Sequence, residues 1–88
     1  MRNFYQIVYE EVSTDTRLMS KGSEKRVKCT DGYFANSKNE ALLKLEKNRG
    51  VRHNKIIRSG THTVQYYIIL IQAMEELEWR KLKVRVWT

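Results

Sequence analysis

The chain of 88 residues has no proline, one cysteine, two histidines and four glycines. A single cysteine cannot form a disulfide within the chain, which favours a reducing compartment and predicts a cytoplasmic location. The glycines stand apart, at positions 22, 32, 50 and 60, so no glycine-rich loop is present that could hold phosphate groups. The sequence therefore gives no reason to expect a nucleotide cofactor.

Long hydrophobic runs are also missing. The longest extends only from Tyr66 to Ile71, whereas a membrane-spanning helix needs about 20 apolar residues. The N-terminal residues MRNFYQIVYEE include two carboxylates, which a secretory signal would not contain. A 41% share of hydrophobic residues argues against a disordered basic tail. We therefore expect one globular domain over residues 1–88 that does not enter a membrane.

Metal ligands and nucleophiles are scarce. Cys29, His53 and His62 are the only cysteine and histidine residues, and their spacing matches no zinc motif. Cys29 shares the parity of Val27 in a strand-like segment, where a thiol usually acts as a small hydrophobic group. Neither a metal site nor a cysteine nucleophile is expected.

Two strands are predicted in the first third of the chain. Residues 3–12 are rich in aromatic and β-branched side chains on both parities, which is typical of a strand covered on both faces. Residues 24–30 alternate, with Val27 and Cys29 inward and the charged residues outward. Polar residues 13–16 and 21–23 favour turns, so the two strands are expected to pair as a hairpin.

A helix is predicted over residues 38–48. Ser37 and Glu40 have the spacing of a capping box, in which each side chain bonds to the other residue's backbone N–H. Ala41, Leu42 and Leu45 would lie on one side, and Gly50 would end the helix.

The remaining segments complete an α+β fold. Residues 54–58 and 61–71 are predicted strands separated by a turn at Ser59–Gly60. Glutamates before cations favour a helix over residues 73–83 followed by an extended tail, Val84–Trp87, although residues 79–87 also alternate like a strand. The expected order is β-β-α-β-β-α, with a mixed or antiparallel sheet of about four strands and helices on one face.

Positive charge is the most informative feature of the composition. The chain has 17 Lys and Arg against 10 Asp and Glu, and it contains no carboxylate between Lys47 and Met74. Cations in one surface region attract polyanions such as nucleic acids. His53, Asn54 and Thr61 could add hydrogen bonds to phosphate or sugar oxygens. The candidate binding residues are Lys47, Arg49, Arg52, His53, Lys55 and Arg58, extended by Arg26, Lys28, Arg80, Lys81, Lys83 and Arg85.

Aromatic residues lie between these cations. Tyr66, Tyr67, Trp79 and Trp87 could stack on unpaired bases if exposed. A small domain also needs its aromatic rings for its core, and we expect at least half of them to be buried.

The segment Val27–Leu70 resembles two families. A hairpin is followed by a Ser-x-x-Glu-Ala helix (Ser37, Glu40, Ala41), then Gly50 and a basic strand pair; this order resembles small phage-encoded anti-CRISPR proteins directed at type I systems. The same helix followed by the basic loop NRGVRHNK is similar to the LX family of large-subunit ribosomal proteins. The Glu-rich, Trp-containing C-terminal segment departs from both families. Both resemblances imply a non-enzymatic binding protein.

The sequence therefore predicts a non-catalytic protein that binds nucleic acid or a nucleic-acid-loaded complex, as a phage inhibitor of a host defence would. One alternative is a protein–protein inhibitor or a homodimer formed through an exposed edge strand, with no nucleic-acid contact. Another is a small metal-independent ribonuclease with His53 and His62 as acid and base, although the helices of basic ribonuclease toxins precede their main sheet.

Overall fold

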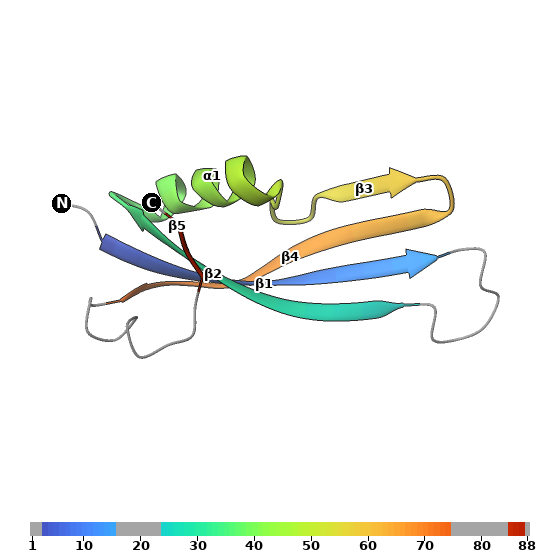
Figure 1. The fold of residues 1–88 in the computed structure, drawn as a ribbon, viewed down its shortest axis with the longest axis horizontal. Helices are drawn as coiled ribbons and strands as arrows, with labels where there is room; N and C mark the ends of the chain where they lie inside the picture. Colours follow the sequence, from blue (N-terminus) through green and yellow to red (C-terminus); the bar gives the residue numbers. More distant parts are fainter. Residues whose placement is uncertain (1–2, 16–23, 75–84, 88) are drawn as a thin grey trace.

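The protein is an elongated molecule of 50 × 23 × 16 Å built on a twisted sheet (Figure 1). The computed structural model describes residues 3–15, 24–74 and, for the backbone only, 85–87. Five described strands form one sheet in the order β3-β4-β1-β2-β5. The helix α1 lies across one end of this sheet, so the two ends have different surroundings.

The predicted hairpin is confirmed and is longer than expected. β1 (Asn3–Asp15) pairs antiparallel with β2 (Lys25–Ala35) from Asn3↔Ala35 to Ser13↔Lys25. The predicted turn at residues 13–16 is wrong, because Ser13–Asp15 continue β1 and also pair with β4. Partners on β4 satisfy the backbone of these polar residues, which overrides their turn preference. The turn signal at residues 21–23 lies outside the described residues.

The helix α1 (Lys38–Arg49) confirms the predicted boundaries to within a residue. The Ser37 hydroxyl accepts a hydrogen bond from the Glu40 backbone N–H at 3.1 Å, and Gly50 ends the helix with a left-handed φ of 68°. The second half of the expected capping box is replaced, because the Glu40 carboxylate lies 3.6 Å from the Lys44 ammonium one turn later.

The third and fourth strands also follow the prediction. β3 (Ile56–Ser59) and β4 (His62–Met74) form a hairpin, and β4 lies between β3 and β1. The pairing with β3 covers only His62–Gln65, so the central position does not account for the apolar middle of β4, where Ile69 and Leu70 are 52% and 45% exposed. The register between β1 and β4 shifts at Val8/Tyr9, where Val8 faces Leu70 and Tyr9 faces Ile68. Ile69 is thus the extra residue of a β-bulge.

The predicted order is wrong after β4. Ala73 and Met74, assigned to the start of a second helix, belong to β4, and the rest of that prediction lies outside the described residues. The extended tail is confirmed as β5 (Arg85–Trp87), which pairs parallel with β2 and makes the sheet mixed. The described order is therefore β-β-α-β-β-β. Tertiary pairing with Phe4 and Tyr5 extends β4 past the point where the sequence favours a helix.

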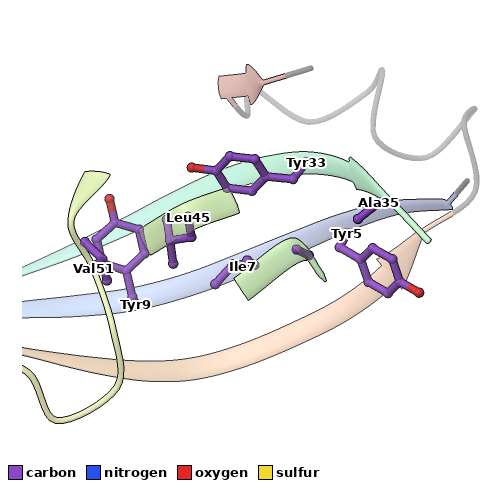
Figure 2. Packing of buried hydrophobic residues seen from close by; sticks show 8 residues of the cluster. Tyr5, Ile7, Tyr9, Tyr33, Ala35, Leu45 and Val51 are labelled. Carbon is purple, nitrogen blue, oxygen red and sulfur yellow. The ribbon is translucent and has the colours of Figure 1, made fainter. Parts of the chain in front are cut away.

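The core lies between α1 and the half of the sheet on which α1 packs (Figure 2). We call this half of the sheet the covered end, and the half beyond α1 the open end. Fully or almost fully buried side chains gather at the covered end: Tyr5, Ile7, Tyr9, Tyr33, Ala35, Ala41, Leu45 and Val51. Burying a side chain such as Leu45 stabilises the fold by about 1.5–3 kcal/mol.

The face opposite α1 is closed at the same end by aromatic side chains. Phe4 and Phe34 are cross-strand partners whose rings meet edge-to-face at 5.2 Å. Gly32 makes room for this arrangement, because a Cβ atom there would lie 2.1 Å from Cζ of Phe4. Glycine is needed at this position so that the Phe4 ring can lie against the backbone of β2.

Candidate interaction surface

Between Lys47 and Met74 the sequence contains no carboxylate, and we call this stretch the acid-free run. The elements that carry its cations follow one side of the sheet. Lys47 and Arg49 are in the last turn of α1, Arg52 and Lys55 are in the linker, and Arg58 is in β3. Figure 1 shows α1, the linker and β3 in succession along the side of the sheet that ends at β3. We call the surface formed by Lys47, Arg49, Arg52, His53, Lys55 and Arg58 the basic edge.

Arg49 is engaged inside the protein. Its Nε lies 3.3 Å from Oδ2 of Asp31, a carboxylate on β2 that is fully buried. The Tyr9 hydroxyl donates to the same oxygen at 3.4 Å. A buried carboxylate needs such partners, so Arg49 neutralises Asp31 and contributes to folding. The sequence did not predict this pair, because Asp31 is 18 residues away from Arg49 along the chain and only the fold brings the two together.

Arg52 and Lys55 make contacts that contribute less to stability than the buried pair of Arg49 and Asp31. Arg52 is 65% exposed and lies 3.9 Å from the Glu46 carboxylate, a separation at which a solvated ion pair contributes about 0–1 kcal/mol. The Lys55 ammonium donates to the Gly50 carbonyl at 3.1 Å. This bond satisfies a carbonyl just after α1, and no carboxylate of the described residues lies within ion-pair distance of Lys55.

Lys47 and Arg58 are the most available members of the basic edge. Both are exposed, and no carboxylate of the described residues lies within the 4.0 Å of an ion pair. Together with Arg52 they place three solvated cations along the side of the molecule. Such groups can meet phosphates without first breaking a strong internal contact.

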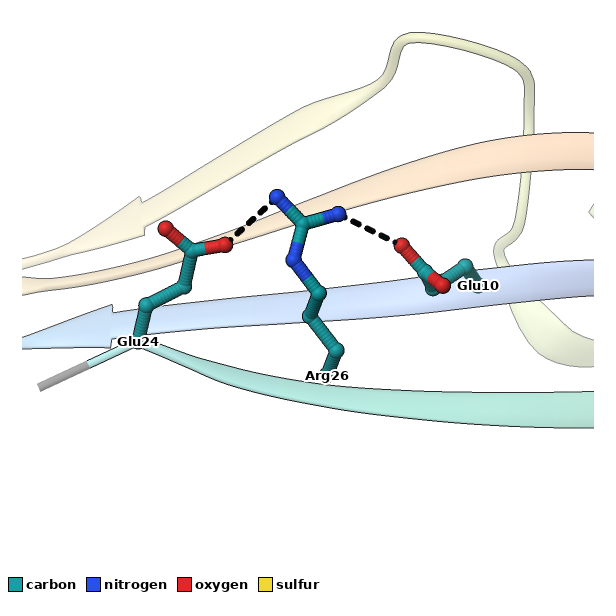
Figure 3. A network of polar contacts seen from close by, with 3 residues as sticks. All are labelled: Glu10, Glu24 and Arg26. Carbon is teal, nitrogen blue, oxygen red and sulfur yellow. Dashed lines mark hydrogen bonds and ion pairs between the residues drawn. The ribbon is translucent and has the colours of Figure 1, made fainter. Parts of the chain in front are cut away.

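The cations of β2 belong to a different region. Arg26 and Lys28 lie on the face opposite α1, and β1 and β4 separate their strand from β3. The Arg26 guanidinium bridges Glu10 at 2.8 Å and Glu24 at 2.6 Å (Figure 3). The hydrogen bond with Glu10 and the charge of Glu24 raise the pKa of Arg26. The fold therefore does not bring Arg26 and Lys28 to the basic edge.

The C-terminal candidates cannot be placed on a surface. Arg80, Lys81 and Lys83 lie outside the described residues, as does Trp79. Arg85 and Trp87 belong to β5, for which only the backbone pairing with β2 is described.

The two histidines lie far apart. Nδ1 of His53 accepts a hydrogen bond from the Ile68 backbone N–H at 3.0 Å, and its ring meets Tyr67 edge-to-face at 6.4 Å. His62 pairs with Ser59 at the far end of the same strand. His62 and Ile68 are six positions apart along the strand, which corresponds to about 20 Å. The structure therefore does not bring together the acid and base that the ribonuclease alternative requires.

The tyrosines of β4 are partly buried. Tyr66 packs edge-to-face on Tyr9 at 6.4 Å, and burial, together with the charge of Glu11, raises its pKa. Tyr67 is half-buried beside His53. Both tyrosines border the basic edge, Tyr66 through its backbone bond with Lys55 and Tyr67 through its ring contact with His53. The Tyr66 ring is engaged with Tyr9, so Tyr67 is the ring better placed to stack on a base there.

Cys29 is half-buried and lines a small, largely polar hollow of about 250 Å³ together with Tyr9, Glu11, Arg49, Val51 and Tyr66. No histidine belongs to this lining. Within the described ranges there is also no group of three or more His, Cys, Asp or Glu that could hold a metal ion.

A larger cleft of about 520 Å³ escaped the sequence analysis. Its apolar walls come from Leu42 and Leu43 of α1, Val51 of the linker and Ile68 of β4. Polar groups form the remainder of the lining: Asn39, Glu46, Arg52 and His53. One signal was present, because Leu43 is a large apolar residue at a helix position outside the predicted buried stripe, and it is 66% exposed.

Comparisons with known proteins leave the function open. Neither the protein-family models, nor the curated proteins, nor the solved structures contain a match to this chain. In the part of the chain that the structure describes, no helix has the length and apolar character needed to cross a membrane.

Proposed function

We propose that this protein is a non-catalytic nucleic-acid-binding protein that uses the basic edge. The observation that supports this function is the placement of Lys47, Arg52 and Arg58. All three are exposed on consecutive elements, α1, the linker and β3, within a stretch of sequence that contains no carboxylate. Each cation that meets a phosphate releases condensed counterions, so binding would be strong at low salt and insensitive to base sequence.

His53 and Tyr67 would add to this contact. Their rings meet edge-to-face at 6.4 Å, and His53 lines the cleft together with Arg52. An aromatic pair next to phosphate-binding cations is suited to single strands, whose bases are free to stack. We therefore favour a single-stranded nucleic acid over a duplex as the ligand.

The role as a phage inhibitor of a nucleic-acid-loaded defence complex stays a prediction. A basic edge would serve such a role by occupying the path of the complex's nucleic acid. A purely protein partner is the second candidate function, and the apolar cleft beside α1 favours it, because apolar walls suit a protein side chain better than a phosphate.

Salt-dependent binding tests the proposed function. Fluorescence anisotropy with a labelled single strand should give an affinity that falls steeply with salt. The variant Lys47→Gln/Arg52→Gln/Arg58→Gln should lower affinity for every sequence and reduce the slope of log K against log salt by about 2–3.

A matched variant controls for net charge. Lys25→Gln/Lys28→Gln/Lys38→Gln removes the same number of exposed charges away from the basic edge. It should change the slope by less than the first variant. Equal losses from both variants would mean non-localised attraction by net charge, and absence of binding at low salt would overturn the proposal.

A further inference from the structure

The outer edge of β4 is only partly covered. β3 pairs with His62–Gln65, and the linker continues this coverage through the bonds of Asn54 and Lys55 with Tyr66 and of His53 with Ile68. From Leu70 to Met74, β4 pairs with β1 on one side; on the other side of Ile69–Met74 no described strand lies. Among the described residues, this segment therefore presents backbone groups without a strand partner along a sheet edge.

The chemistry of this edge is unusual for a basic protein. Between Arg58 and Glu75 the sequence contains no Asp, Glu, Lys or Arg, and it has no proline. Ile69 is 52% exposed and Leu70 is 45% exposed. Exposed edges in monomeric proteins usually carry a lysine or proline that prevents pairing with another chain, and neither is present in this segment.

The apolar cleft adjoins the open edge. Ile68, the last residue of β4 bonded to the linker, forms one wall, and the exposed Leu43 of α1 forms another. A strand added along Ile69–Met74 would continue the line of β3 and pass beside this cleft. The backbone edge and the apolar walls of the cleft therefore suit an extended segment that carries apolar side chains.

We propose that the occupant is a second copy of this chain, paired antiparallel through Ile69–Met74 about a two-fold axis. The exposed Ile69 and Leu70 of a second copy supply such apolar side chains, and two-fold pairing closes both edges with the same set of contacts. Like charges repel elsewhere on a protein of net charge +7, and the uncharged segment removes that repulsion where the copies meet. This inference does not depend on nucleic-acid binding.

Sedimentation equilibrium of the full chain, without nucleic acid, tests the dimer. An interface of one strand pair is at the small end of specific interfaces, so we expect a dissociation constant on the order of 10 μM. Ile69→Lys should abolish association by placing a charge on the edge. Ile57→Lys is the matched control, because Ile57 is 43% exposed on β3, outside the proposed contact; this variant should still dimerise.

Disulfide formation locates the contact independently. In a Cys29→Ser background, single cysteines at positions 69–73 should form disulfide-linked dimers most readily near the two-fold axis, and Ile57→Cys should not. Circular dichroism would confirm that each variant is folded. A wild-type monomer at all concentrations overturns the proposal, and so does equal loss of association in the two lysine variants.

Discussion

The covered end and the open end of the sheet are made from the same strands but differ in what stabilises them. At the covered end, Ile7 of β1 and Leu45 of α1 are fully buried where the helix packs on the sheet. At the open end, Val27, Ile56 and Ile57 remain 41%, 46% and 43% exposed. β-strand sequence alone does not create a core. A second layer must remove the side chains from water, and the helix reaches only one end.

The difference has a functional counterpart. The basic edge begins at the C-terminus of α1 and continues along the open end as far as Arg58. Stability comes chiefly from the covered end, so solvated cations at the open end do not disturb the core. Arg49 marks the boundary, because its guanidinium reaches back to the buried Asp31.

Removing Leu45 tests the comparison with the largest expected effect. Leu45→Ala leaves a cavity under α1 and should lower the free energy of unfolding by about 3 kcal/mol. Ile57→Thr at the open end should change it by no more than about 0.5 kcal/mol. Urea unfolding of both variants gives the two values. Similar losses would show that the two ends contribute equally to stability.

Gly32→Ala probes the aromatic contact at the covered end. The new methyl group would collide with the Phe4 ring, so we expect a loss of about 2 kcal/mol. Phe4→Leu removes the colliding ring atoms at some cost of its own. In a double-mutant cycle the two changes should therefore cost less together than the sum of the single losses. Strict additivity would mean that Phe4 does not determine the need for glycine.

A pH titration gives the smallest expected effect. Burial raises the pKa of Tyr33 and of Tyr66 above the ordinary value near 10. The unfolded chain then releases these phenol protons at lower pH than the native protein, so native stability falls as the pH rises past about 10. Tyr33→Phe/Tyr66→Phe should reduce that fall. Unfolding midpoints between pH 8 and 11 would measure it, and an unchanged slope would contradict it.

Much of the fold followed from local patterns. The strands around Ile7, Cys29 and Val64 were predictable from β-branched and aromatic residues, and α1 from Ser37 and Gly50. The predicted secondary structure was wrong where pairing in the sheet outweighed the local preference for a turn or a helix. Ser13–Asp15 and Ala73–Met74 became strand because a neighbouring strand satisfies their backbone groups.

The candidate site was predictable only as a list of residues. The acid-free run identified the cations, but distance along the chain does not show which carboxylates lie nearby. The fold assigns Asp31 to Arg49 and Glu10 to Arg26, and leaves Lys47 and Arg58 solvated. The apolar cleft required the packing of α1 against β4, which no local pattern encodes.

The sequence alone determined that this protein is a small basic α+β domain, with one well-capped helix and an uncharged stretch that ends at Met74. Those properties depend on composition and on neighbours along the chain. The tertiary structure decided which half of the sheet is covered. Among the described residues it also decided which cations have no ion pair and which part of β4 has no strand on its outer side. Each of these depends on groups that are distant in sequence and adjacent in space, because burial and ion pairing act through space.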